Sequence, residues 1–212
     1  VCLGYANEAG VASDIINVTT IWQAPDYNAF IFDVPSQTIT GYRGSATEIT
    51  VPSQINGVDV LVIGTSALED KGLTSVTISN GITTIKSKAF YDNSIATLTL
   101  PNSITTIGTS AFDNNALTAV TLPSNLQSIG GLAFANNQIA DIIIPNSVTN
   151  MDSYAFYRNR ADSITIGTGL TQLEGGVFSE ARWISGSLSS VTIPDNIANI
   201  QSAAFYGVPL TT

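Results

Sequence analysis

Apolar positions recur along the chain with a period of 22 residues. The period is extended by Leu68 on its N-terminal side and by Phe205 on its C-terminal side, the latter after a unit that is five residues longer. A fixed period of this length is typical of proteins in which short units stack on one another. The sequence therefore predicts about seven stacked units. The aromatic residues that mark the period are Phe90, Phe112, Phe134, Phe156 and Phe178.

Each unit contains a short segment in which apolar and polar residues alternate, such as "TLTL" at 97–100 and "AVTL" at 119–122. Alternation with a period of two, rich in β-branched residues, predicts a strand with one buried face. A proline or another turn residue then ends the strand. We expect the inward positions to be Val76 and Ile78, Leu98 and Leu100, Val120 and Leu122, Ile142 and Ile144, Ile164 and Ile166, and Val191 and Ile193.

The rest of the unit predicts a second inward edge and a corner. Two aliphatic residues three positions apart, such as Ile82 and Ile85, form the edge, and a short helical turn is expected at the Ala-Phe pair that closes the unit. An asparagine then recurs three positions after the aromatic residue. A ladder of amides could bind a ligand or could satisfy backbone groups at the corner, and we favour the backbone interpretation. The column consists of Asn93, Asn115, Asn137 and Asn159.

The unit L-x-x-V-x-I-P-x-x-I-x-x-I-x-x-x-A-F-x-x-N, repeated over 46–206, resembles the BspA-like leucine-rich repeats of bacterial cell-surface proteins. The segment Ile39 to Leu68 also resembles the usual opening of such domains. Many members carry cysteine where this chain carries the asparagine column. The resemblance implies an α/β solenoid, a leucine-rich-repeat right-handed superhelix with a parallel β-sheet on its concave face. It also implies export, surface display and binding to host or neighbouring-cell proteins.

The period divides the chain into two segments. Residues 1–45 lie outside it and are rich in aromatic residues, which fits an N-terminal cap over the exposed core of the first coil. A separate ligand-binding module is the alternative for this segment. Residues 46–212 are expected to form the repeat solenoid.

Composition narrows the chemistry. Only 11% of the residues are charged and the formal net charge is −9, which argues against nucleic acid and anionic membrane as partners. The chain has no histidine and only one cysteine, Cys2, so we expect no metal, no cofactor and no enzymatic activity. Glu48 and Asp141 lie on one ladder but four coils apart, too far to cooperate as a catalytic pair. No apolar run reaches the roughly 20 residues that span a bilayer.

Two surfaces are candidates for binding. An insertion between Phe178 and Val191 contains Arg182 and Trp183, which fit the composition of binding hot spots, although the tryptophan could instead pack locally. The outward positions of the strands form a ladder that could bind a ligand or could simply stabilise the sheet by cross-strand packing. This ladder contains Thr77, Thr99, Thr121, Ile143, Thr165 and Thr192.

The function that best fits these features is a non-enzymatic, extracellular or cell-surface interaction and adhesion module. Its ligands would be host or neighbouring-cell proteins or glycans, and any export signal would have been removed or would lie outside this sequence. A structural spacer within a longer surface protein is the alternative. Binding to ice would require a flat face, which Asp141 and Ile143 interrupt.

Overall fold

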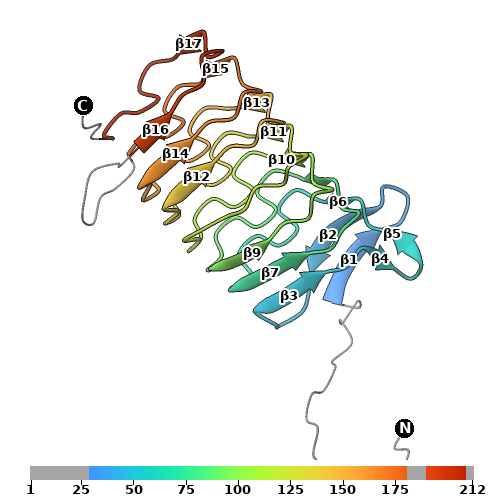
Figure 1. The fold of residues 1–212 in the computed structure, drawn as a ribbon. Helices are drawn as coiled ribbons and strands as arrows, with labels where there is room; N and C mark the ends of the chain where they lie inside the picture. Colours follow the sequence, from blue (N-terminus) through green and yellow to red (C-terminus); the bar gives the residue numbers. More distant parts are fainter. Residues whose placement is uncertain (1–28, 181–189, 209–212) are drawn as a thin grey trace, which may run out of the picture.

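The computed structural model describes residues 29–180 and 190–208 of the chain. Each repeat forms one coil, most coils contain two short strands, and successive coils stack into an elongated solenoid (Figure 1). The first described strands, in blue, lie at one end of the stack, and the last, in red, lie at the other. Strands of neighbouring coils pair in parallel. The predicted repeat solenoid with parallel strands is therefore confirmed.

The first strands of the coils form one side of the solenoid, which we call the threonine face. Their pairing keeps equivalent repeat positions opposite each other, as in Thr77 beside Thr99 and Ile143 beside Thr165. The inward residues Val76 and Ile164 are fully buried. The face is made of two parallel three-stranded sheets, β3 (Glu48–Val51), β7 (Ser75–Ile78) and β9 (Thr97–Thr99), and β12 (Asp141–Ile143), β14 (Ser163–Thr165) and β16 (Ser190–Thr192).

The strand predicted at 119–122 is wrong. No ladder pairing is found at these described residues, and the threonine face is divided there between β9 and β12. Leu122 nevertheless remains buried, with 8% of its surface exposed. The apolar pattern fixes which side chains face the core, but it does not by itself impose backbone pairing with the neighbouring coils.

The second strands form the opposite side of each coil. A seven-stranded sheet runs through this side, and we call it the spine sheet. Its parallel members carry the predicted second inward edge, and their last residues are buried, as at Ile85 and Ile107. The parallel part ends at Met151, and a separate two-stranded sheet follows. The strands are β6 (Val62–Ile63), β8 (Thr84–Ile85), β10 (Thr106–Ile107), β11 (Ser128–Ile129) and β13 (Asn150–Met151), then β15 (Gln172–Leu173) and β17 (Asn199–Ile200).

Two hairpins lie at the N-terminal end. Strand β1 (Phe30–Asp33) pairs antiparallel with β2 (Thr38–Tyr42), and β2 pairs in parallel with β6, so this hairpin extends the spine sheet. Strands β4 (Gln54–Ile55) and β5 (Val58–Asp59) form the second hairpin. Its two turn residues have positive φ, 52° at Asn56 and 79° at Gly57, the pattern of a type I′ turn.

The recurring phenylalanines form a continuous column along the core. Phe90 and Phe112 stack with 5.1 Å between their ring centroids, and Phe112 and Phe134 with 5.4 Å. The column continues through Phe156 and Phe178 to Phe205, with parallel or slightly tilted rings. Each ring is therefore buried by the coils on both sides of it, which explains why the chain keeps one aromatic residue per period.

The helical turn expected at the Ala-Phe pair is wrong, because two successive turns occupy this segment. Each turn contains a residue in the left-handed region, such as Lys88 with φ 57° and Asp92 with φ 56°. The N–H groups of Lys88, Phe90 and Asp92 donate to carbonyl oxygens of the next coil, at 2.9, 2.8 and 3.1 Å. These bonds between coils use the donors that an α-helix would need within the segment.

Candidate functional site

The structure brings most of the predicted binding residues together on the threonine face. Thr77 lies beside Thr99 in one sheet, and in the other sheet Ile143, Thr165 and Thr192 lie in consecutive register. All of these side chains are exposed. Ile143 has 61% of its surface in solvent, which makes it an apolar side chain within a row of hydroxyls.

The remaining predicted site residues stand apart from this row. Thr121 is exposed but belongs to the coil that does not pair with its neighbours. Arg182 and Trp183 lie outside the described residues. The threonine face therefore consists of two ordered patches on either side of Thr121.

The asparagine column forms a ladder at the corner of the coils. The amide nitrogen of Asn137 donates to the carbonyl oxygens of Phe112, Phe134 and Ala135 at 2.9, 3.2 and 3.0 Å. Its side-chain oxygen accepts a hydrogen bond from the N–H of Leu117 at 3.0 Å. Equivalent bonds recur one coil away in each direction. The backbone interpretation of this column is therefore confirmed, because its amides are already engaged by backbone groups.

An open hollow of about 330 Å³ lies over part of this ladder, and we call it the corner hollow. Its residues come from three successive coils, and all of their side chains are amides or guanidinium groups. Two of the ladder asparagines, Asn137 and Asn159, are each flanked in the sequence by two further residues that line the hollow. The lining residues are Asn115, Asn136, Asn137, Gln138, Arg158, Asn159 and Arg160.

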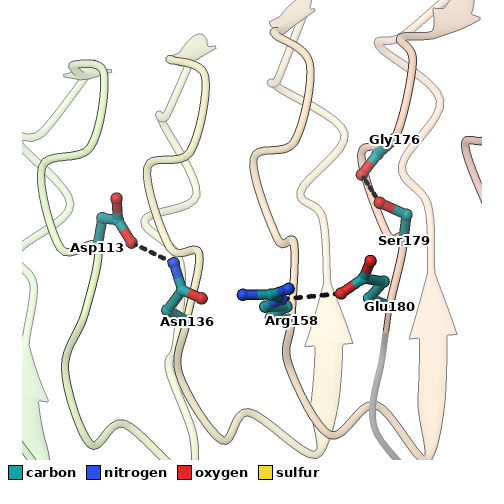
Figure 2. Close-up of polar contacts among 6 residues, drawn as sticks. All are labelled: Asp113, Asn136, Arg158, Gly176, Ser179 and Glu180. Atoms are coloured by element: carbon teal, nitrogen blue, oxygen red, sulfur yellow. Dashed lines mark hydrogen bonds and ion pairs between the residues drawn. The ribbon is translucent and has the colours of Figure 1, made fainter.

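A row of polar contacts crosses four coils beside the ladder. Asn136 donates its amide to the carboxylate of Asp113 at 2.9 Å, and Arg158 binds Glu180 through its Nε at 2.8 Å (Figure 2). The guanidinium of Arg158 also lies over the ring of Tyr157, 4.9 Å from the centroid. In Figure 2, Asn136 and Arg158 are neighbours between the two carboxylates. Glu180 and the ring of Tyr157 thus hold the Arg158 side chain, and its guanidinium group lies within the row of polar contacts, between Asn136 and Glu180 (Figure 2).

Gln138 and Arg160 also line the hollow, and each follows a ladder asparagine in the chain. Their backbone N–H groups bond to Leu117 and Ile139 of the preceding coil, which fixes the chain at this position. Within 29–180 and 190–208, neither side chain has a hydrogen bond or an ion pair. Arg160 is exposed, so its guanidinium presents unpaired donors at the edge of the hollow.

Burial perturbs one carboxyl group next to the hollow. Desolvation raises the pKa of Asp113, and hydrogen bonds from Asn136, Ser110 and the N–H of Asn114 partly oppose this effect. The Asp113 side chain is buried. Its carboxylate therefore serves as an internal acceptor that positions Asn136.

Sequence reasoning missed the corner hollow. The signal was present as "RNR" at 158–160, where two of the chain's seven basic residues flank a ladder asparagine. The repeat pattern shows that Asn159 faces inward, so the two arginines that flank it face outward on the same surface.

Among the described residues, no group of three or more potential metal-ligating side chains is found. The same part of the chain contains no helix of the length and apolarity that crossing a bilayer requires.

Comparison with solved structures shows the same fold in bacterial proteins. A leucine-rich repeat protein from T. pallidum superposes with a TM-score of 0.69 at 25% identity, over 83% of this chain and 80% of that one. A leucine-rich repeat protein from Bacteroides ovatus gives a TM-score of 0.69 at 25% identity, over 84% of this chain and 48% of that one. A leucine-rich cell-surface protein from Faecalibacterium prausnitzii is 31% identical, with a TM-score of 0.53, over 86% of this chain and 45% of that one.

The chain thus spans about half the length of the second and third of these proteins. No curated protein matches the chain. The family model for the BspA-type leucine-rich repeat region matches in six copies, over residues 61–184 and 162–212. Repeat proteins of this kind are typically binding scaffolds, and no catalytic family is indicated. The repeated core, the parallel strands and this match together establish that the chain belongs to the BspA-type leucine-rich repeat family.

Proposed function

We propose that the chain is a non-enzymatic adhesion module, displayed at the cell surface, that binds host or neighbouring-cell proteins or glycans. The family supports a role in protein interaction, and the cell-surface protein of F. prausnitzii supports surface display. One observation carries the choice of binding face. Ile143 is 61% exposed in the edge strand β12, at the start of a row that continues through the hydroxyls of Thr165 and Thr192, and exposed apolar side chains on an otherwise polar face mark interaction sites.

The threonine face suits recognition by shape. Its strands are about 4.8 Å apart, so the side chains repeat at a fixed spacing. In the register, Ile143 is followed by Thr165 and then by Thr192, which offer hydroxyl and methyl groups without charge. A partner could therefore bury Ile143 in a contact while its polar groups pair with these neighbouring hydroxyls.

The test is a surface-binding assay of the purified chain against immobilised extracellular-matrix proteins and glycans. For a ligand that binds, Ile143→Arg should weaken the affinity at least about tenfold, because it places a charge in the contact. The matched control is Thr171→Arg, which adds the same charge at an exposed position just before β15, on the side of the spine sheet. Equal effects of the two variants would exclude the threonine face. Failure of the whole panel would favour the structural spacer.

A further inference from the structure

The corner hollow differs chemically from the threonine face. All seven of its lining side chains are amides or guanidinium groups, and none is apolar. The centres of protein–protein contacts are usually apolar and depleted in charge, so this lining does not resemble a docking site for a peptide anchor. Amides offer both donors and acceptors, which are the partners that sugar hydroxyls need.

The groups available to a ligand follow from the contacts. The amides of Asn137 and Asn159 are occupied by backbone groups, so they form a rigid floor. Asn136 uses its nitrogen on Asp113, and its carbonyl oxygen has no partner among the described residues. The side chain of Gln138 also lines the hollow and has no hydrogen bond among the described residues. The hollow therefore offers neutral hydrogen-bonding groups to a ligand.

The two arginines add positive charge to the same hollow. Arg158 and Arg160 both line the hollow, directly before and directly after the floor residue Asn159 in the chain. The charge of Arg158 is partly balanced by Glu180, whereas Arg160 has no ion pair within the described part of the chain. Although the chain has a formal net charge of −9, the unpaired guanidinium group of Arg160 gives the hollow a local site for an anion. The anchoring of Arg158 by Glu180 and Tyr157 lowers the entropy that binding would cost.

From this arrangement we propose that the corner hollow binds an acidic saccharide. Its carboxylate lies at Arg160, within reach of the terminal nitrogens of Arg158, and its hydroxyls pair with Asn136 and Gln138. The volume of about 330 Å³ is at the lower end of the range for ligand sites, which is roughly 300–1,000 Å³. Because the hollow is open and crosses three coils, it admits an oligosaccharide lying along the surface. The proposal rests on the proposed function only in treating the chain as a binding module.

Two saccharides distinguish the possible sources of the carboxylate. Trigalacturonate carries it on a uronic acid, and 3′-sialyllactose carries it on a sialic acid. The uncharged comparisons are the methyl ester of trigalacturonate and lactose. Titrations followed by amide chemical shifts of the whole chain should give saturable shifts at Gln138, Arg158 and Arg160 for at least one acidic saccharide. The matching uncharged sugar should bind at least about tenfold more weakly, because it loses a charge-assisted hydrogen bond.

The decisive variant is Arg160→Gln, which removes the unpaired charge without breaking a contact among the described residues. It should weaken binding about tenfold, whereas Arg43→Gln should leave the affinity within about twofold. Arg43 is also exposed and follows β2 at the other end of the solenoid (Figure 1), so it controls for net charge. Equal losses in the two variants, or equal binding of the uncharged sugar, would overturn the proposal.

A glutamate-rich peptide serves as the competing ligand. If it binds the hollow more tightly than both acidic saccharides, the assignment to a saccharide is wrong. Absence of saccharide binding, with an Ile143-dependent partner retained in the surface assay, would refute this inference alone. Absence of both would also refute the proposed function.

Discussion

One asparagine per coil satisfies several backbone groups at once. Asn137 pairs with three carbonyl oxygens and one N–H group, and these groups belong to its own coil and to the preceding one. The corner makes tight turns in which neither a helix nor a sheet supplies these partners. A buried backbone group without a partner costs free energy, so the side chain replaces the missing secondary structure.

Replacing Asn137 with alanine tests this role. The Asn137→Ala variant leaves the N–H of Leu117 without a partner and removes one of the donors to each of the three carbonyl oxygens, which keep bonds from Asn115, Asn159 and the N–H of Asn114, and we expect the free energy of unfolding to fall by about 2–3 kcal/mol. Urea denaturation measures the change. The control is Asn150→Ala, whose side chain is exposed and donates only to the side chains of Ser128 and Asp152, and which should cost less than about 1 kcal/mol. Similar losses in both variants would contradict a special role for the ladder.

A buried carboxyl group makes a prediction about pH. Because burial raises the pKa of Asp113 above its ordinary value of 3.8, the folded state holds this proton more tightly than the unfolded state does. The contribution of Asp113 to stability is therefore most favourable below pH 3.8 and is lost as the pH rises through the folded pKa. The Asp113→Asn variant keeps an oxygen that can accept the bond from Asn136 and has no charge to bury.

Thermal melts of the two proteins between pH 3 and pH 7 measure this difference. The melting temperature of Asp113→Asn should rise relative to that of the wild type as the pH increases, and the gap should level off above the folded pKa. All other carboxyl groups are common to both chains, so their titration cancels in the comparison. A gap that does not change with pH would mean that Asp113 ionises as freely in the folded chain as in the unfolded one.

At the scale of secondary-structure elements, the hairpin of β1 and β2 protects the N-terminal edge of the spine sheet. Strand β2 covers the edge of β6 by pairing Thr38 with Val62 and Ile39 with Ile63. Both isoleucines are fully buried. An uncovered edge strand would expose unpaired backbone groups, and an uncovered first coil would expose apolar core. Residues 29–45 thus include a hairpin that covers this edge, and the capping role of the whole segment 1–45 stays a prediction, since residues 1–28 lie outside the described part of the chain.

Charge substitutions on the two faces of the hairpin test that role. We expect Ile39→Asp to lower the melting temperature strongly, because it buries an unpaired charge against the first coil. Ile31→Asp places the same charge in β1 at a side chain that is 36% exposed, so its effect should be small. Differential scanning calorimetry distinguishes the outcomes. If Ile39→Asp melts like the wild type, the hairpin is not coupled to the solenoid.

The sequence predicts those features of the elements that depend on burial. Most inward positions of both strand sets, such as Val76 and Ile85, and the aromatic column follow from the apolar period. Ile193 in the last coil was also expected to face inward, but 40% of its surface is exposed. The absence of strand pairing at 119–122 could not be predicted from the apolar period, because the hydrogen bonds between strands depend on backbone geometry that the side-chain pattern does not determine. The small residues before Phe90 led to the prediction of a helical turn where the structure has left-handed turns. The sequence does not reveal that the N–H group of Phe90 donates a hydrogen bond to the next coil.

The candidate sites were predictable to different degrees. The exposed row on the threonine face follows directly from strand alternation, so five of its six residues occupy the expected strands. The corner hollow depends on which columns border the asparagine ladder in space, and it was not recognised because basic residues at 158 and 160 do not recur in the other units. A periodic signal identifies architecture, whereas a site that occurs once in the chain requires the three-dimensional structure.

At the scale of the whole molecule, stability comes from contacts between neighbouring coils. Phe134 lies between Phe112 and Phe156, with ring centroids 5.4 and 5.3 Å away, and it is fully buried. The last aromatic residue of the column, Phe205, stacks on Phe178 and is only partly buried. A cavity in the middle of the stack therefore weakens two interfaces between coils.

The same substitution at the two positions should have unequal effects. We expect Phe134→Ala to lower the free energy of unfolding by about 3–5 kcal/mol, which is typical for a buried phenylalanine. Phe205→Ala should cost well under half of that, because its ring is already partly in solvent. Thermal and urea denaturation measure both losses. Equal losses would mean that the core is not continuous through the stack.

The two interruptions in the sheets bear on how the molecule carries a mechanical load. The threonine face lacks ladder bonds at 119–122, where β10, β11 and β13 pair continuously on the opposite side. The spine sheet in turn stops after β13, at a level where β12, β14 and β16 are continuous. Separation of neighbouring coils that starts at either interruption therefore meets intact strand pairing on the other face. In the adhesion role proposed above, this stagger would leave no single level at which both sheets are interrupted and the stack separates easily.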